Sequence, residues 1–301
     1  MTELKKFFSL VMRNTKYYFK DKVSFFMSLI TPLILLVLYV TFLRNVYIQS
    51  FEAAFPEGFT VDERLVNGVA GAWLMSSILS VSAVTVAFCS NLVIVEDKIQ
   101  SSINDFMVSP VKSTTVSLAY FASNFFVTFI VLMVAMCIGH IYLAAVGWYI
   151  TAGDFFMIIV DCICGILFGT LLAGIVGNFI KTQGSVSAVD TLVSSMYGFI
   201  CGAYMPISTF SEGLQNVLGL LPGTYSVGIM RTHYMGGYLQ ALSDAGVPAE
   251  AINGIKDGFD ANLYFFGNSV PLGAMYGILL GTCAVLLTAF IAIVILKSKR
   301  K

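Results

Sequence analysis

Charged side chains are scarce in this sequence of 301 residues. Asp, Glu, Lys and Arg together make up 11% of the chain, whereas hydrophobic residues make up 57%. A typical soluble domain is about 25% charged and about 45–50% apolar. The shortage of charge therefore excludes an ordinary soluble enzyme. The long apolar runs, unlike the short alternating segments of an outer-membrane barrel, predict an all-α integral membrane protein.

The sequence also lacks the motifs of hydrolytic and metal-dependent enzymes. It contains no G-x-x-x-x-G-K-[ST] loop for phosphates, no H-E-x-x-H and no G-x-S-x-G, and it has only two histidines. Its six cysteines all fall inside apolar runs, so the loops offer no disulfide framework. We therefore expect a chain that is not itself an enzyme and that binds no metal, cofactor or nucleic acid.

Six apolar runs reach the length of about 20 residues that crosses about 30 Å of hydrocarbon. They are residues 23–43, 69–95, 116–143, 155–180, 186–207 and 270–296. Before them, residues 1–22 mix Lys and Arg with aromatic residues in a helical pattern, which predicts an amphipathic helix in the membrane interface. The alternative is a disordered basic flank that only orients the first span. The whole chain, residues 1–301, is predicted to be one transmembrane domain.

The distribution of positive charge predicts the orientation of the chain. With six spans both termini share one side, and the segments on that side hold thirteen of the seventeen Lys and Arg residues. The other side keeps only Arg44, Arg64, Arg231 and Lys256. Because Lys and Arg accumulate in cytoplasmic loops, we expect both termini to be cytoplasmic, in a multi-pass protein of the cytoplasmic membrane.

The stretch between the fifth and sixth spans is apolar but broken twice. Pro206 interrupts it first, and Leu221-Pro222-Gly223 interrupts it again before Tyr225 and Arg231. Broken backbone and charge at membrane depth are tolerated only where protein or a water-filled cavity covers them. We therefore predict a re-entrant helical pair at residues 208–238. It would form an outer gate that includes Pro206, Leu221, Pro222, Tyr225 and Arg231.

Two acidic residues lie inside predicted spans, where ionisable groups are functional candidates by default. Asp161 lies deep in the fourth run, and Asp190 lies nearer the inner end of the fifth. Asp190 is expected to hydrogen-bond near the interface. For Asp161 we hypothesise an ion pair with Arg231, which would fix the gate against the fourth span.

Residues 99–110, between the second and third spans, predict a short amphipathic helix on the cytoplasmic side. Ile99, Ile103, Phe106 and Met107 recur at helical spacing, and Pro110 ends the pattern. Apolar side chains exposed on such a helix suit the groove of a partner protein. A connector that dips its apolar face into lipid headgroups fits the pattern equally well.

The order of these features resembles the permease subunits of type-2 ABC exporters, which carry drugs, lipids or polysaccharides. The resemblance covers nearly the whole chain. It is most specific in E-D-x-x-x-x-S-x-x-D-F-M-x-S-P-V, which begins at residue 96, and in G-A-Y-M-P-I-S…L-P-G-T-Y-S…M-R, which begins at residue 202. The chain departs from the family after Pro206, where a further proline is usual and this sequence has Thr209-Phe210-Ser211.

The resemblance implies a dimer of permeases, identical or paralogous, on two copies of a separate cytoplasmic ABC ATPase that binds ATP and Mg. The residues that match the coupling helix of the family, which contacts the ATPase, are Ile99, Ile103, Asp105, Phe106, Met107 and Pro110. Residues 208–238 match the re-entrant outer gate of the family. The conduit would run between the two permeases, lined largely by the first, second and fifth spans.

Aromatic and Met side chains at the end of the fifth span suit hydrophobic cargo molecules of variable shape. The candidate cargo path consists of Tyr197, Phe199, Tyr204 and Met205, although ordinary bundle packing explains each of them singly. The predicted function is ATP-driven export of a hydrophobic or amphipathic cargo, such as a drug, a peptide or a lipid-linked molecule. The alternatives are an ATPase-independent secondary transporter or channel, and a non-transporting resistance or immunity subunit.

Overall fold

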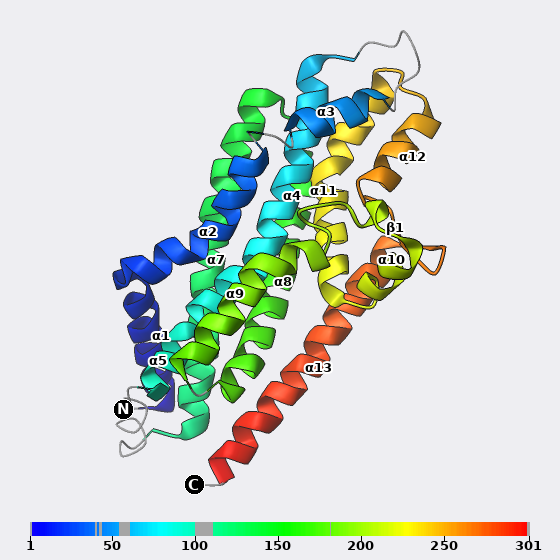
Figure 1. Ribbon diagram of the computed structural model, residues 1–301. Helices are drawn as coiled ribbons and strands as arrows, with labels where there is room; N and C mark the ends of the chain where they lie inside the picture. The colour runs from blue at the N-terminus through cyan, green and yellow to red at the C-terminus, as the bar shows by residue number, and fades with distance from the viewer. Residues whose placement is uncertain are drawn as a thin grey trace.

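The computed structural model describes residues 2–39, 41, 44–53, 61–99, 111–180 and 182–299. The long helices of the chain form a bundle, with one small hairpin of strands at its side (Figure 1). Both termini lie at one end of the bundle (Figure 1). Helices α3 (Arg44–Ala53) and α12 (Ala249–Gly258) lie at the opposite end. The prediction of a nearly all-α architecture is confirmed.

The centre of the bundle is α4 (Glu63–Ser90), which continues after one turn residue as α5 (Leu92–Ile99). Every residue of α4 from Leu65 to Ser90 is buried. Its sequence is rich in Gly, Ala and Ser, whose small side chains let neighbouring helices approach closely. At Gly169 of a neighbouring helix, an added Cβ atom would lie 2.4 Å from the carbonyl oxygen of Ala83. The chain thus encloses α4 on all its faces.

The helices that pack around α4 come from all parts of the sequence. They are α2 (Lys22–Leu38), α7 (Ser113–Val146), α8 (Ala152–Phe179), α9 (Gln183–Ile200) and α11 (Pro222–Asp244). Helix α1 (Glu3–Lys20) covers most of the residues predicted to form an amphipathic helix, and it packs against α7. Its buried side chains are Val11, Asn14 and Tyr18.

Helix α9 ends at Ile200, seven residues before the end of the predicted run. Gly202 follows with a φ of +75°, a backbone conformation that glycine adopts without the steric penalty of other residues. The chain then forms the short helices η2 (Ile207–Thr209) and α10 (Glu212–Leu218). Helix α11 follows and continues past the predicted limit of residue 238 to Asp244.

The segment after α12 contains the only strands in the described part of the chain. β1 (Leu263–Phe265) and β2 (Asn268–Val270) form an antiparallel hairpin, which the sequence analysis did not predict. The last helix, α13 (Leu272–Lys299), runs back to the end that holds the N-terminus (Figure 1).

Four of the described helices are long and apolar enough to cross a membrane: α4 with α5 (Glu63–Ile99), α7, α8 and most of α13 (Leu272–Leu296). They correspond to the second, third, fourth and sixth predicted runs. The helices of the first and fifth runs are shorter, since α2 has 17 residues and α9 has 18. The count of six spans therefore stays a prediction.

Candidate functional site

A buried arginine, Arg231 of α11, lies where four segments of the chain meet. Its side chain is 1% exposed, and its Nη1 atom lies 3.1 Å from Oδ2 of Asp260. Asp260 also accepts hydrogen bonds from the backbone N–H groups of Ile207 and Ser208, the latter at 3.0 Å. A buried ion pair is tolerated only when further hydrogen bonds satisfy the remaining polar atoms. These bonds therefore compensate the desolvation of the Asp260 carboxylate, whereas the buried Nε atom of Arg231 has no hydrogen-bond partner among the described residues.

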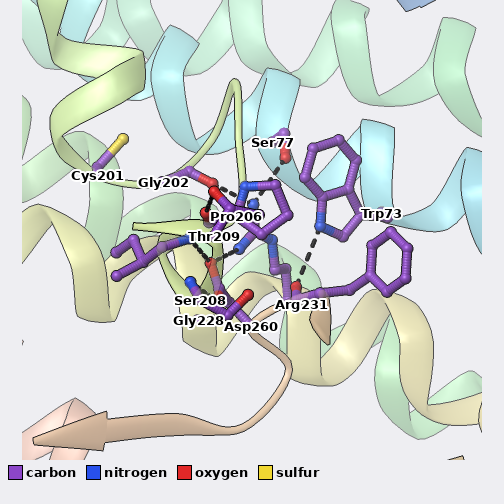
Figure 2. Close-up of polar contacts among 12 residues, drawn as sticks. Trp73, Ser77, Cys201, Gly202, Pro206, Ser208, Thr209, Gly228, Arg231 and Asp260 are labelled. Carbon is purple, nitrogen blue, oxygen red and sulfur yellow. Dashed lines mark hydrogen bonds and ion pairs between the residues drawn. The ribbon is translucent and has the colours of Figure 1, made fainter. Parts of the chain in front are cut away.

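The other terminal nitrogen of Arg231 reaches α4 and the turn after α9. Nη2 donates to the carbonyl oxygen of Gly202 and to Oγ of Ser77, the latter at 3.3 Å. The guanidinium carbon lies 4.8 Å from the centre of the Trp73 ring, within range of a cation–π contact. Figure 2 shows these groups converging on Arg231. We call Arg231, Asp260, Gly202, Ser77 and Trp73 the arginine clamp.

The hypothesis of an ion pair between Asp161 and Arg231 is wrong. Oδ2 of Asp161 lies 2.7 Å from Nδ1 of His233, and the hydroxyl of Tyr276 on α13 donates to its Oδ1. Arg231 and His233 are two positions apart, which is about 200° around a helix, so they point to opposite sides of α11. Only His233 faces α8, and Asp161 therefore links α8 to α11 and α13.

The residues predicted for the outer gate fall into two places. Pro206 is buried and precedes η2, beside the arginine clamp (Figure 2). Leu221 and Pro222 form the start of α11, where proline lacks only an N–H that would have no partner in the helix. Tyr225, one turn later, donates its hydroxyl to the carbonyl oxygen of Gly219 and so ties α11 to the end of α10.

A cleft of about 900 Å³ opens between α2, α3, α9, the turn at Pro206, and α12. We call it the lateral cleft. Three of the four residues predicted for a cargo path line it: Phe199, Tyr204 and Met205. Tyr197 is not among the lining residues and packs instead against Gly223 of α11, because it points to the other side of α9 from Phe199.

The walls of the lateral cleft are apolar and aromatic, with hydroxyl groups from Ser50, Ser194, Ser195 and Thr209. No charged side chain is among its described lining residues. Apolar surface with a few polar groups is the usual composition of a small-molecule site. The contributions of α3 and α12, which include Tyr47 and Phe259, were missed by the sequence analysis because both helices lie outside the six apolar runs and outside the predicted gate.

The lateral cleft and the arginine clamp share a wall. Pro206 and Phe259 line the cleft, and the residues that follow each of them, Ile207 and Asp260, are hydrogen-bonded to each other behind it. Nε1 of Trp73 donates to the carbonyl oxygen of Phe259 at 3.1 Å, which joins this wall to α4. The clamp therefore fixes the shape of one side of the cleft.

The family model of the ABC-2 type transporter matches residues 5–235 of the chain. The chain belongs to the ABC-2 type transporter family. No curated protein matches it. The match runs from α1 into α11, so this ABC-2 permease carries Arg231 inside the matched region and Asp260 outside it. In the described part of the permease, no group of His, Cys, Asp and Glu side chains has the arrangement of a metal site.

Of the residues predicted to couple this ABC-2 permease to an ATPase, the structure describes only Ile99. It lies at the end of α5 and is 40% exposed. The other predicted coupling residues lie outside the described residues: Ile103, Asp105, Phe106, Met107 and Pro110. Their contact with an ATPase therefore stays a prediction.

A polar cluster lies directly before that segment and joins α1, α5 and α7 of the permease. Arg13 binds Asp97 with both terminal nitrogens, Nη2 at 3.1 Å from Oδ1 and Nη1 close to Oδ2. The hydroxyl of Tyr120 donates to Oδ2 of the same carboxylate. The hydrogen bond with Asp97 raises the pKa of the Arg13 guanidinium. Bidentate ion pairs of this kind are strong and fix the relative orientation of the two side chains. Helix α1 is therefore held to the base of α4 and α5.

Proposed function

We propose that this ABC-2 permease exports a hydrophobic or amphipathic cargo across the cytoplasmic membrane, driven by a separate ATPase. The complex would contain two copies of a cytoplasmic ABC ATPase, which bind ATP and Mg, and a second permease chain. The observation that carries the proposal is the lateral cleft, whose volume and uncharged walls suit a drug, a peptide or a lipid-linked molecule.

The proposed topology has six spans, formed by α2, α4 with α5, α7, α8, α9 and α13. Helices α10 and α11 form the re-entrant outer gate in this arrangement. Both termini then lie in the cytoplasm, in agreement with their position at one end of the bundle and with the distribution of Lys and Arg. The shorter helices α2 and α9 are counted as spans because they lie mostly within the first and fifth apolar runs, which are long enough to cross.

The proposed route of coupling runs along α4 and α5. Asp97 at the cytoplasmic base is held by Arg13, and Ser77 and Trp73 contact Arg231 about 30 Å further along the same helix, at 1.5 Å per residue. Movement of the ATPase against residues 99–110 would displace this helix. The arginine clamp would then transmit the displacement to the wall of the lateral cleft.

The decisive experiment is purification of the permease with its attached subunits in mild detergent, followed by ATPase assays with a panel of drugs and lipids. We expect a stoichiometric ATPase whose activity rises with a cargo. In Ser195→Arg, a charged and bulky side chain enters the lateral cleft, and stimulation by cargo should fall about tenfold or more. Ser195→Ala, the matched control, should keep the stimulation.

Three outcomes would contradict the proposal. Cargo movement by the purified chain alone, without an ATPase, would support a secondary transporter or channel. A chain that binds a toxin but moves no solute, with or without the ATPase, would support an immunity subunit. Equal cargo stimulation of Ser195→Arg and the parent protein would show that the lateral cleft does not hold the cargo.

A further inference from the structure

A second cleft, of about 310 Å³, lies at the end of the bundle opposite the termini. It is bounded by the start of α3, the start of α4 and the end of α7. Arg44 and Arg64 both line it, together with Glu63, Asn67 and Tyr142. We call it the outer arginine cleft. It shares none of its lining residues with the lateral cleft.

Arg44 is held in place by a buried amide. Its Nη2 atom donates to Oδ1 of Asn67, whose own Nδ2 donates to the carbonyl oxygen of Glu63 at 2.7 Å. Asn67 is 8% exposed, so its orientation is fixed by the helix around it. The remaining N–H groups of Arg44 form no hydrogen bond to the described residues. Arg44 is thus oriented by protein on one side and keeps donors for a ligand on the other.

The positive charge of the outer arginine cleft is not neutralised by an ion pair within the described chain. Neither Arg44 nor Arg64 has a carboxylate within 4.0 Å among the described residues. The carboxylate of Glu63, which also lines the cleft, forms no ion pair with either of them. Only four Lys and Arg residues fall on this side of the predicted topology. Arg231 is already paired with Asp260 in the arginine clamp. Two of the other three therefore meet in one cleft, which points to an anionic ligand.

The apolar surface of α7 shows the depth of this cleft in a bilayer. A row of exposed side chains runs along the helix: Leu118, Phe126, Ile130, Val134, Ile138 and Ile141. Such a row is the surface that faces hydrocarbon. The next turn of α7 brings Ala145 and Val146 to the wall of the outer arginine cleft, and Trp148 follows with 45% exposure. Because Trp concentrates where hydrocarbon meets headgroups, the cleft lies at the level of phosphate groups.

We propose that the outer arginine cleft binds the phosphate group of a phospholipid in the outer leaflet. Arg44 and Arg64 donate hydrogen bonds to the phosphate oxygens, as guanidinium groups do with phosphate elsewhere. The carboxylate of Glu63, which also lines the cleft, suits the ammonium group of a zwitterionic headgroup. The assignment to the outer leaflet rests on the orientation given in the proposed function. The binding of phosphate by Arg44 and Arg64 does not depend on that orientation.

The test is native mass spectrometry of the full-length permease in detergent, with added phosphatidylethanolamine, phosphatidylglycerol or diacylglycerol. We expect both phospholipids to bind, and diacylglycerol, which has no phosphate, not to bind at this site. In Arg44→Gln/Arg64→Gln the affinity for phosphatidylethanolamine should fall about tenfold or more, the loss associated with a hydrogen bond to a charged group. Lys256→Gln, which removes a positive charge from the same end of the molecule, should bind as the parent does.

Three results would overturn the proposal: equal affinity of the double variant and the parent, equal binding of diacylglycerol, or displacement of the lipid by inorganic phosphate at millimolar concentration. The last would identify free phosphate, not a lipid headgroup, as the ligand. Thermal unfolding of the double variant in detergent checks that it is folded. Since no ATPase or cargo is needed, failure here is distinguishable from failure of the proposed export function.

Discussion

The guanidinium of Arg231 is almost inaccessible to water, and its position can be understood only from its partners. Asp260 follows α12 in a left-handed conformation, with a φ of +54°. This turn directs the carboxylate back toward α11 and the N–H groups of Ile207 and Ser208. Residues from distant parts of the sequence thus meet at one charge. Removal of either partner leaves the other charge buried and uncompensated.

We expect Arg231→Gln to lower the free energy of unfolding by about 3–5 kcal/mol, the usual cost of an unpaired buried charge. Asp260→Asn should also destabilise the chain. The double variant should lose less than the sum of the two single losses, because the two residues interact directly. Chemical unfolding in detergent, followed by Trp fluorescence, measures all three. Trp73 beside Arg231 makes the signal sensitive to the clamp.

The control for the clamp is Glu250→Gln, which removes an exposed carboxylate from α12. Surface substitutions of this kind change stability by about 0.5 kcal/mol or less. Strict additivity of the Arg231 and Asp260 losses would contradict a direct interaction between them in the folded chain.

The sequence predicted the residues of the candidate site better than their pairings. Phe199, Tyr204 and Met205 were predicted for a cargo path, and all three line the lateral cleft. Arg231 was recognised as a buried charge, but its partner was not. An ion pair depends on which face of α11 each residue occupies and on the turn at Asp260, and neither can be read from an apolar run.

At the scale of whole elements, the long helices follow from hydrophobic length and the broken ones do not. α7, α8 and α13 begin and end within a few residues of the predicted runs. α9 ends early because Gly202 turns the chain, and an added Cβ atom there would lie 2.6 Å from Cγ1 of Ile207. The hairpin of β1 and β2 has strands of three residues, which are too short to show an alternating pattern.

The glycine-rich faces of α8 and α13 have different surroundings. Gly169 of α8 packs closely against Ala83 of α4. At Gly273, Gly277 and Gly281 of α13, an added Cβ atom would meet no described atom within 4 Å. The small residues of α13 therefore lie on an outer face of the described chain.

The pairing of α1 with α5 predicts a specific defect in coupling. In Asp97→Asn, the bidentate ion pair with Arg13 is lost, while the amide still fits the space that the carboxylate occupies. We expect the variant to assemble with its ATPase and to hydrolyse ATP, but to move several-fold less cargo per ATP. The measurement is the ratio of transport to hydrolysis in reconstituted vesicles. Lys16→Gln, an exposed charge on the same helix, is the control.

An unchanged ratio in Asp97→Asn would show that α1 is not part of the coupling route. Loss of ATPase assembly would instead assign Arg13 and Asp97 a role in docking, and it would contradict the coupling route in the same way.

For the molecule as a whole, the positions of the termini and of α12 make the proposed orientation testable. We expect Asn253→Cys, on the exposed side of α12, to react with a membrane-impermeant maleimide added to intact cells. Ser9→Cys, exposed on α1, should react only after the membrane is made permeable. The parent protein is the control, because five of its six free cysteines are buried and Cys137 lies on the apolar surface of α7. Labelling of Ser9→Cys in intact cells would contradict the proposed orientation and would place the N-terminus outside the cell.

A helix that is touched on every side, as α4 is, has no freedom to rotate or slide by itself. Any movement of α4 in the proposed transport cycle must carry its neighbours along, so the inner part of the chain has to move as one rigid body. Alternate opening toward the two sides of the membrane would then arise at the perimeter, where α2, α9 and α13 expose apolar side chains that can slide against lipid or against the proposed second permease.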